Sequence, residues 1–444
     1  MSRRVSSLLS LSAFVLVLLC VPVSAGAAVT CDRVAAPSGS DSAAGTVAAP
    51  LRTLEALLEA VEPGQTACLR GGTYGGVEPR LHDPDSELTS YPGETATITS
   101  MLEVMNTAKR SHVHHLRFDA TNFDSTAAIK IQADDAVLSD NHITKGGKSI
   151  CVQVASSHIA YRVRIERNRI YNCGPANSKF DHQLYLEQSR DAVVRQNILT
   201  GNAGGWGVHL YSDADGSLIE HNIIDGNRGG VIFAGDGNKT SDNNEVRNNA
   251  VTNSGPRWNI EGSWSGGPRG SGNTAHHNCL YTAGPDGPGG VERTAGGFTP
   301  TSNHIAGGSP YVNRSRGDLR FKSGSACDRL VGAVAGPSVR TARISSVRIA
   351  LSLRARRRLV RPGGLAKLRG RLVAPARAAG AKVRIQVRRR GAWRTLAVRR
   401  TSAKGRFTLR LRAGKTRHAR ITRLRAVVRG VAKSRTVRLR VRPR

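Results

Sequence analysis

Four residues in the middle of the chain have side chains that transfer protons: Tyr185, Glu187, His209 and Tyr211. Within each pair the two residues are separated by one position, so both point to the same face if the segment is a β-strand. Histidine titrates near neutrality, tyrosine serves as an acid or as a phenolate base, and a carboxylate orients its partner. These four are the candidate catalytic residues, provided that the fold places the two pairs side by side.

Further charged and aromatic residues near these four could contact a substrate or a cation. The candidate substrate-binding residues are His182, Arg190, Asp213, Lys239 and Trp206. The candidate metal ligands are Asp213, Asp215 and Asp236. Carboxylate oxygens are ligands that Ca²⁺ prefers, so Ca²⁺ is the candidate cofactor, although acidic pairs in glycine-containing loops are also typical of turns. Structural roles are the alternative: an outward tyrosine or histidine can cover a sheet face, and Glu187 can pair with Arg190.

The elements that carry these residues are sequence repeats. Six asparagines are separated by 27, 29, 25, 27 and 29 residues: Asn141, Asn168, Asn197, Asn222, Asn249 and Asn278. An apolar or small residue stands three positions before each of them, and an apolar residue stands two positions after. The pattern predicts coils of three short strands stacked as parallel sheets, with each asparagine in the left-handed conformation at a bend and bonded along a column. These asparagines are therefore expected to be structural.

The repeats resemble those of right-handed parallel β-helices of the pectate-lyase-like superfamily, and the resemblance covers roughly residues 35–328. Motifs near both ends support it: Ser38–Ser42, Pro63–Thr66, Gly71–Tyr74, Ser309–Val312 and Gly317–Arg320. The resemblance implies a helix that covers the N-terminal end of the solenoid. Apolar residues at helical spacing would form its buried face: Leu54, Leu57, Leu58 and Val61.

By the same resemblance, the first strand of each coil carries its outward side chains toward a substrate groove. One outward column is expected to contain Tyr185, His209, Ile232 and Asn259. The neighbouring column is expected to contain Glu187, Tyr211, Ala234 and Glu261. The four candidate catalytic residues would then lie within about 5–7 Å of each other.

Three functions stay open for such a groove. The first, which we prefer, is β-elimination or C5-epimerisation of a uronic-acid polysaccharide, which needs a base, an acid and a cation that neutralises the carboxylate. His209 together with Tyr211 or Tyr185 is the expected proton-transfer pair. The second is inverting glycoside hydrolysis by two carboxylates about 6.5–9.5 Å apart, for which Glu187 and the three loop aspartates are candidates. The third is a glycan-binding or structural cell-surface protein without catalysis, because a fold does not determine an activity.

The N-terminus and the cysteines indicate export. Arg3 and Arg4, followed by the apolar run Leu8–Val23 and small residues, predict a signal peptide over residues 1–27, and no later segment is apolar enough to span a membrane. Six cysteines remain, without a Cys-x-x-Cys motif, which favours disulfides. Pairing of sequence neighbours gives Cys31–Cys68, Cys151–Cys173 and Cys279–Cys327. We expect a secreted, extracellular monomer.

The positive charge is confined to the C-terminal part of the chain. The formal net charge is +34, yet residues 331–444 hold 36 Lys and Arg and no acidic residue. Seven alternating segments between residues 347 and 441 predict an immunoglobulin-like β-sandwich over 346–444, after a linker over 329–345. The arginines are evenly spread and almost without aromatic neighbours, which argues against nucleic acid. An acidic polysaccharide or an anionic cell-wall polymer is the expected partner, with a merely solvated surface as the alternative.

Overall fold

The computed structural model describes residues 30–262, 267–283, 290–291, 296–334 and 336–337 of the first part of the chain. In the second part it describes residues 350–355, 359–360, 365–373, 382–389, 392–402, 406–412, 420–428, 432–433 and 437–441. The chain divides into two compact units, residues 1–340 and 341–444, and each is described by itself. The predicted signal peptide, residues 1–27, lies outside the described residues. No helix within the described ranges is long and apolar enough to span a membrane.

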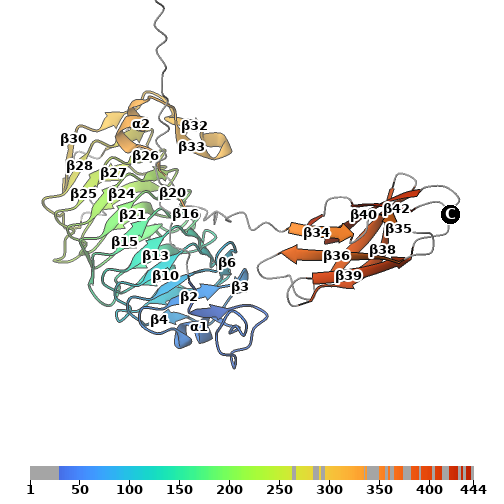
Figure 1. Cartoon of the computed structure of the whole chain (residues 1–444). Helices are drawn as coiled ribbons and strands as arrows, with labels where there is room; N and C mark the ends of the chain where they lie inside the picture. The colour runs from blue at the N-terminus through green and yellow to red at the C-terminus, as the bar shows by residue number, and fades with distance from the viewer. Residues whose placement is uncertain are drawn as a thin grey trace, which may run out of the picture. The chain divides into compact units, whose positions relative to one another are not determined.

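The first unit is a parallel β-solenoid with three sheets, and its coils follow one another in chain order (Figure 1). The eleven-stranded sheet contains β1 (Arg33–Ala35), β2 (Thr66–Leu69), β5 (Glu87–Ser90), β8 (His112–His114), β11 (Val137–Ser139), β15 (Arg164–Glu166), β19 (Val193–Arg195), β22 (Leu218–Glu220), β25 (Glu245–Arg247), β28 (Thr274–His276) and β30 (Thr299–Thr301). The ten-stranded sheet contains β3 (Gly72–Tyr74), β6 (Ala96–Ile98), β9 (Arg117–Asp119), β12 (His142–Thr144), β16 (Arg169–Tyr171), β20 (Ile198–Thr200), β23 (Ile223–Asp225), β26 (Ala250–Thr252), β29 (Cys279–Tyr281) and β31 (His304–Ile305). The predicted right-handed parallel β-helix is confirmed.

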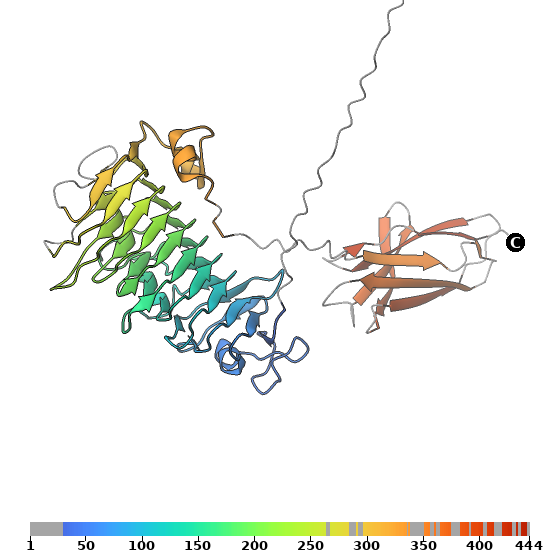
Figure 2. The same ribbon diagram turned by 60° about the vertical axis from the view of Figure 1, so that its left-hand side comes forward.

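The eight-stranded sheet carries the four candidate catalytic residues. It contains β4 (Arg80–Leu81), β7 (Leu102–Val104), β10 (Ala127–Ile131), β13 (Ile150–Val154), β17 (Leu184–Leu186), β21 (Trp206–Leu210), β24 (Gly229–Phe233) and β27 (Ile260–Glu261). Two short strands, β14 (Ala160–Tyr161) and β18 (Ser189–Arg190), follow β13 and β17 in the chain and pair with each other. The turned view in Figure 2 shows the strands stacked as parallel arrows along the solenoid.

The repeat asparagines form a buried ladder between the eleven-stranded and ten-stranded sheets. Each amide donates to the side-chain oxygen of the next asparagine at 2.9–3.1 Å, and the ladder continues to Asn303. One detail of the prediction is wrong, because the left-handed residue is the one before each asparagine. These residues have φ of 51–59°: Asp140, Arg167, Gln196, His221, Asn248, His277 and Ser302. The asparagine itself is thus free to bond along the column.

Helical segments cover the N-terminal end of the solenoid and one side of its C-terminal half. Helix α1 (Leu54–Ala60) begins after Thr53, whose side chain accepts from the Ala56 amide, and it lies at the N-terminal end (Figures 1 and 2). Its predicted apolar face, Leu54, Leu57 and Leu58 together with Val61 just beyond the helix, is buried. After the last coil, the chain forms β32 (Tyr311–Asn313), η1 (Arg314–Arg316), β33 (Asp318–Phe321) and helix α2 (Ala326–Val331). This segment packs against the outer face of the ten-stranded sheet, where Tyr311 bonds to Thr252 and Arg314 pairs with Asp225.

The three disulfides are those predicted: Cys31–Cys68, Cys151–Cys173 and Cys279–Cys327. The linker, in contrast, begins later than expected. Residues 329–331 are the last turn of α2, and Val331 is buried while its carbonyl accepts a hydrogen bond from the His221 ring. The disulfide at Cys327 holds this helix on the solenoid, which explains why the chain does not leave the first unit at residue 329.

The described residues of the second unit form two β-sheets, and all of their strand pairings are antiparallel except that of β35 with β42. One contains β34 (Ala350–Ala355), β36 (Leu365–Val373) and β39 (Arg406–Arg412), and the other contains β35 (Leu359–Val360), β42 (Val437–Val441), β40 (Arg420–Val428), β37 (Lys382–Arg389), β38 (Ala392–Arg400) and β41 (Ala432–Lys433). The alternation predicted along β37 is confirmed, because Val383 and Ile385 are buried whereas Arg384 and Arg388 are exposed.

Candidate functional site

Neighbouring strands β17 and β21 bring the two predicted pairs together. The strands are parallel, and Tyr185 lies opposite His209. Leucine and valine residues that flank these two positions point into the solenoid and are fully buried. The alternation of a strand therefore sends Tyr185 and His209 to the outer face of the eight-stranded sheet, as expected.

Three aromatic rings of this cluster are stacked. The ring centroids of Tyr185 and His209 are 5.3 Å apart, those of His209 and Tyr211 are 5.1 Å apart, and those of Tyr185 and Tyr211 are 6.1 Å apart. The interplanar angles are 21–27°. This packing fixes the orientation of both tyrosine rings, so their hydroxyl groups have defined positions on the face of the sheet.

His209 lies beneath the tyrosines and is only 5% exposed. Its Nδ1 is 2.7 Å from His182 Nε2, and the Trp206 amide donates to His182 Nδ1. With that amide as donor, neutral His182 carries its proton on Nε2 and donates to His209, which leaves the His209 proton on Nε2. Burial lowers the pKa of His182 to about 3 and also lowers the pKa of His209, so both rings are neutral at pH 7. In this geometry the buried His209 ring packs against both tyrosine rings and helps to hold them in place.

The side chains that reach the surface are tyrosines, carboxylates and lysines. Glu187 is half-buried and accepts a hydrogen bond of 2.7 Å from Gln153 Nε2. Burial raises the pKa of the Glu187 carboxyl, and the nearby Lys130 and Lys239 partly oppose this. The face thus combines a carboxylate of increased basicity with two cations close to it.

Both phenols hold their protons at neutral pH. Burial and the hydrogen bond with Asp236 raise the pKa of Tyr211 to about 12. Burial, together with the negative charge of Glu187, raises the pKa of Tyr185 above its ordinary value. These tyrosines are therefore available as proton donors, whereas their phenolate forms are rare near pH 7.

Several predicted binding residues have structural partners instead. Arg190 forms ion pairs with Asp213 at 2.7 Å and with Asp215 at 3.4 Å, and Asp215 also accepts from the Asp242 amide. Within the described residues, the three loop aspartates do not form a group of metal-ligand atoms. Arg190 is therefore engaged by Asp213 and Asp215 and is not a free cation for substrate, and the structure does not bring these two aspartates together with Asp236 as the predicted Ca²⁺ ligands.

Two other predicted contacts with substrate are wrong because the side chains are buried. Trp206 is fully buried and donates from its indole nitrogen to Glu261, and His182 is 2% exposed. Glu261 also corrects the predicted columns. It lies opposite Ile232, in the column of Tyr185 and His209, where Asn259 was expected. Of the substrate-binding candidates, Lys239 is exposed beside the cluster and remains a prediction.

Gln153 and Lys130 are site residues that the sequence reasoning did not single out. They occupy the same outward column as Tyr185 in the two preceding coils. The signal was present, because both lie at the central outward position of strands that the repeats predicted, but a glutamine and a lysine there have no distinctive motif.

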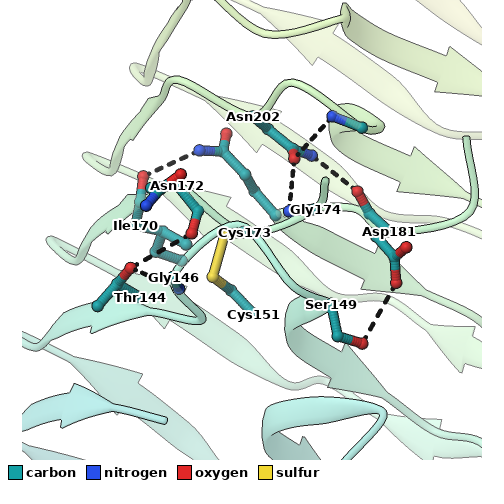
Figure 3. Close-up of a disulfide and its surroundings, with 12 residues drawn as sticks. Thr144, Gly146, Ser149, Cys151, Ile170, Asn172, Cys173, Gly174, Asp181 and Asn202 are labelled. Carbon is teal, nitrogen blue, oxygen red and sulfur yellow. Dashed lines mark hydrogen bonds between the residues drawn. A yellow bond between two sulfur atoms is a disulfide. The ribbon is translucent and has the colours of Figure 1, made fainter. Parts of the chain in front are cut away.

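The loop before Tyr185 is held by a disulfide and an asparagine, as Figure 3 shows. Cys151 in β13 is bonded to Cys173, just after β16. Asn202 accepts from the Gly174 amide at 2.8 Å and donates to the Asp181 carbonyl at 2.9 Å. These bonds fix both ends of residues 174–181, and so they determine where His182 meets His209.

Comparisons with known proteins agree on the architecture. The family model for the right handed beta helix region matches residues 106–251. No curated protein matches the chain in sequence. A solved structure of pectate lyase Pel9A has 13% identity and a TM-score of 0.42, with 67% of this chain and 91% of that chain covered. A structure of XylC with xylose has 11% identity and a TM-score of 0.40, with 56% of this chain and 66% of that chain covered. A rhamnogalacturonan lyase has 12% identity and a TM-score of 0.28, with 63% of this chain and 90% of that chain covered.

Proposed function

Starting from a right-handed parallel β-helix with one outward cluster of tyrosines, carboxylates and lysines, we propose that the protein is a polysaccharide lyase or C5-epimerase acting on a uronate polymer. The observation that carries the proposal is the position of Glu187. Its carboxylate lies beside protonated tyrosines, and Lys130 and Lys239 are close enough to shift its pKa. A base, an acid and a carboxylate-neutralising charge are the three groups that the reaction needs.

In this mechanism the Glu187 carboxylate accepts the proton from C5 of the uronate. The ammonium groups of Lys130 and Lys239 neutralise the sugar carboxylate, which lowers the cost of the negative charge that develops next to it. Tyr185 donates its phenolic proton to the glycosidic oxygen as the bond from C4 to that oxygen breaks and the C4–C5 double bond forms. In an epimerase, the glycosidic bond stays intact, and Tyr185 instead donates its phenolic proton to C5 from the face opposite to Glu187. Tyr211, held by Asp236, orients the neighbouring ring.

Incubation of the purified protein with polygalacturonate, alginate or glycosaminoglycans is expected to produce ultraviolet absorbance from unsaturated chain ends. An epimerase would leave the absorbance unchanged and alter the uronate signals in the NMR spectrum of the polymer. New reducing ends without absorbance would instead identify a hydrolase. Binding without any product on the whole panel would contradict catalysis and favour the glycan-binding alternative.

For the second unit, we propose attachment to an anionic polymer outside the cell. The support is a charge of one sign only: exposed arginines alternate with buried aliphatic residues, and residues 331–444 contain no acidic side chain. The three disulfides fit an oxidising, extracytoplasmic compartment. Attraction between exposed charges is screened by salt, so the attachment should be salt-sensitive.

The full chain is expected to bind polygalacturonate-coated beads at low ionic strength and to be released by moderate salt. Removal of residues 341–444 is expected to abolish this retention while leaving α2 and its disulfide in place. Measurement of the bound fraction against salt concentration checks the result. Equal retention of the shortened chain would contradict the role of the second unit.

A further inference from the structure

A second group of chemically reactive side chains lies on a different sheet, far from the described cluster in sequence. Strands β5 and β8 are parallel neighbours in the eleven-stranded sheet, and Glu87 lies opposite His112. Leu88 and Val113 point into the solenoid and are buried. Strand alternation therefore places Glu87, His112 and His114 together on the outer face of this sheet.

The three side chains are close enough to share one ion. Each offers a ligand atom, and these atoms lie within 4.8 Å of one another. His114 Nε2 is 3.5 Å from Glu87 Oε2. The rings of His112 and His114 are stacked, with centroids 4.1 Å apart. Two imidazoles and a carboxylate thus converge on one point at the junction of β5 and β8.

One ring nitrogen in this group lacks a hydrogen bond. His114 is 1% exposed, and its buried Nε2 has no hydrogen-bond partner. A buried polar atom without a hydrogen bond is destabilising, so an unsatisfied ring nitrogen that faces a carboxylate requires an explanation. The opposite nitrogen, Nδ1, is 2.6 Å from His115 Nδ1. If His114 donates that proton, its Nε2 carries a lone pair toward Glu87, which is the arrangement that a cation stabilises.

The second histidine is held in place as well. His112 Nε2 lies 2.8 Å from Ser139 Oγ, on the next strand of the sheet, β11. Histidines that bind metals are commonly oriented by a hydrogen bond at the other ring nitrogen. His115 and Ser139 give each imidazole one such partner and leave the other nitrogen for a ligand.

We propose that Glu87, His112 and His114 bind a divalent transition metal ion of the Zn²⁺ type. Imidazole nitrogens select transition metals over Ca²⁺ and Mg²⁺, and two histidines with one carboxylate form a known zinc donor set that leaves the fourth position to water. In a tetrahedral site with metal–ligand bonds of about 2.0–2.2 Å, ligand atoms lie about 3.3 Å apart. The Glu87–His114 distance of 3.5 Å is close to this value, and all three ligand atoms lie within 4.8 Å of one another. The ion joins β5 to β8 near the N-terminal end of the solenoid.

The test is calorimetric titration of the untagged, metal-stripped full chain with ZnCl₂. We expect one tight equivalent, which is reduced at least tenfold in affinity by Glu87→Gln and lost in His112→Asn and His114→Asn. With Co²⁺ in place of Zn²⁺, visible absorption bands should appear in the parent and not in the two histidine variants. Circular dichroism verifies that each variant is folded. Because Glu87→Gln alters a half-exposed side chain, this variant still tests the proposal if a histidine variant does not fold.

The chain contains a matched control on the same sheet. His276 is 2.9 Å from Glu245, and its neighbour His277 contacts it as His115 contacts His114. Position 274, however, is threonine where β8 has His112. His276→Asn is therefore expected to leave the Zn²⁺ equivalent unchanged. The proposal is overturned if the parent binds no Zn²⁺, or if His112→Asn and His114→Asn bind it as tightly as the parent does.

Discussion

Replacement of Asn222 by alanine is expected to lower the free energy of unfolding of the β-helix by about 3–5 kcal/mol. The side chain is fully buried in the middle of the ladder. Its oxygen accepts from the backbone and side-chain nitrogens of Asn197, and its amide donates to Val194, Glu220 and Asn249. Alanine leaves several of these buried groups without partners, and water cannot enter to replace them. Urea denaturation monitored by circular dichroism measures the loss.

The same substitution at the end of the ladder provides the control. Asn303 accepts from Asn278 and donates to the Ala275 carbonyl, but it is only partly buried. Water can therefore satisfy the groups that Asn303→Ala would leave, and the expected loss is about 1 kcal/mol. Equal effects at positions 222 and 303 would contradict the view that burial of the ladder determines its contribution.

Replacement of Glu187 by glutamine is expected to lower kcat on the uronate substrate by about 10²–10⁴. Glutamine keeps the shape of the side chain and an oxygen that accepts from Gln153, but it cannot take up a proton. Folding should be unaffected, so the loss reports on chemistry. Glu245→Gln is the matched control, because Glu245 pairs with Arg247 on another sheet. Its kcat should equal that of the parent. A Glu187→Gln variant with full activity would exclude Glu187 as the base.

The pH dependence of the reaction follows from the same assignment. A base must be ionised, so kcat/KM falls as the pH falls through the pKa of Glu187, which burial raises above the ordinary value for glutamate. The acidic limb should therefore lie at a higher pH than for an exposed carboxylate. The acid must be protonated. Because the pKa of Tyr185 is raised above 10, activity should not decline on the alkaline side until the pH exceeds about 10. An acidic limb at the ordinary value for an exposed carboxylate would argue against Glu187.

The fold was predictable because its determinants repeat. The asparagine spacing and the flanking apolar positions recur in six coils, and each coil imposes the same demand on the core. The even number of cysteines after the predicted export signal, paired as sequence neighbours, led to the three disulfides that the structure contains. The pairing of Tyr185 with His209 followed from the same periodicity, since parallel strands in register place equivalent positions side by side.

The sequence did not predict how deeply each side chain is buried, or the strand register in the last coils of the solenoid. His182 contacts His209 because the loop after Cys173 is held by long-range hydrogen bonds to Asn202, and Trp206 contacts the same ring from the start of β21. At the last coil the strand is short, so the register of Glu261 shifts by two residues from the expected column. The alternating histidines of β8 were visible in the sequence, but they lie before the recognised repeats, and Glu87 meets them only through sheet pairing.

The asparagine ladder keeps the same hydrogen bonds although the coils of the solenoid differ in length. Coils of 25 and 29 residues keep the same asparagine bonds, because the difference is confined to connections such as 172–183 between β16 and β17 and 201–205 between β20 and β21. Both connections lead into the strands of the outer aromatic cluster. Insertions and deletions there would alter the surroundings of the cluster without moving the core. The surface around the cluster can therefore be remodelled through changes in loop length while the ladder and the fold stay intact.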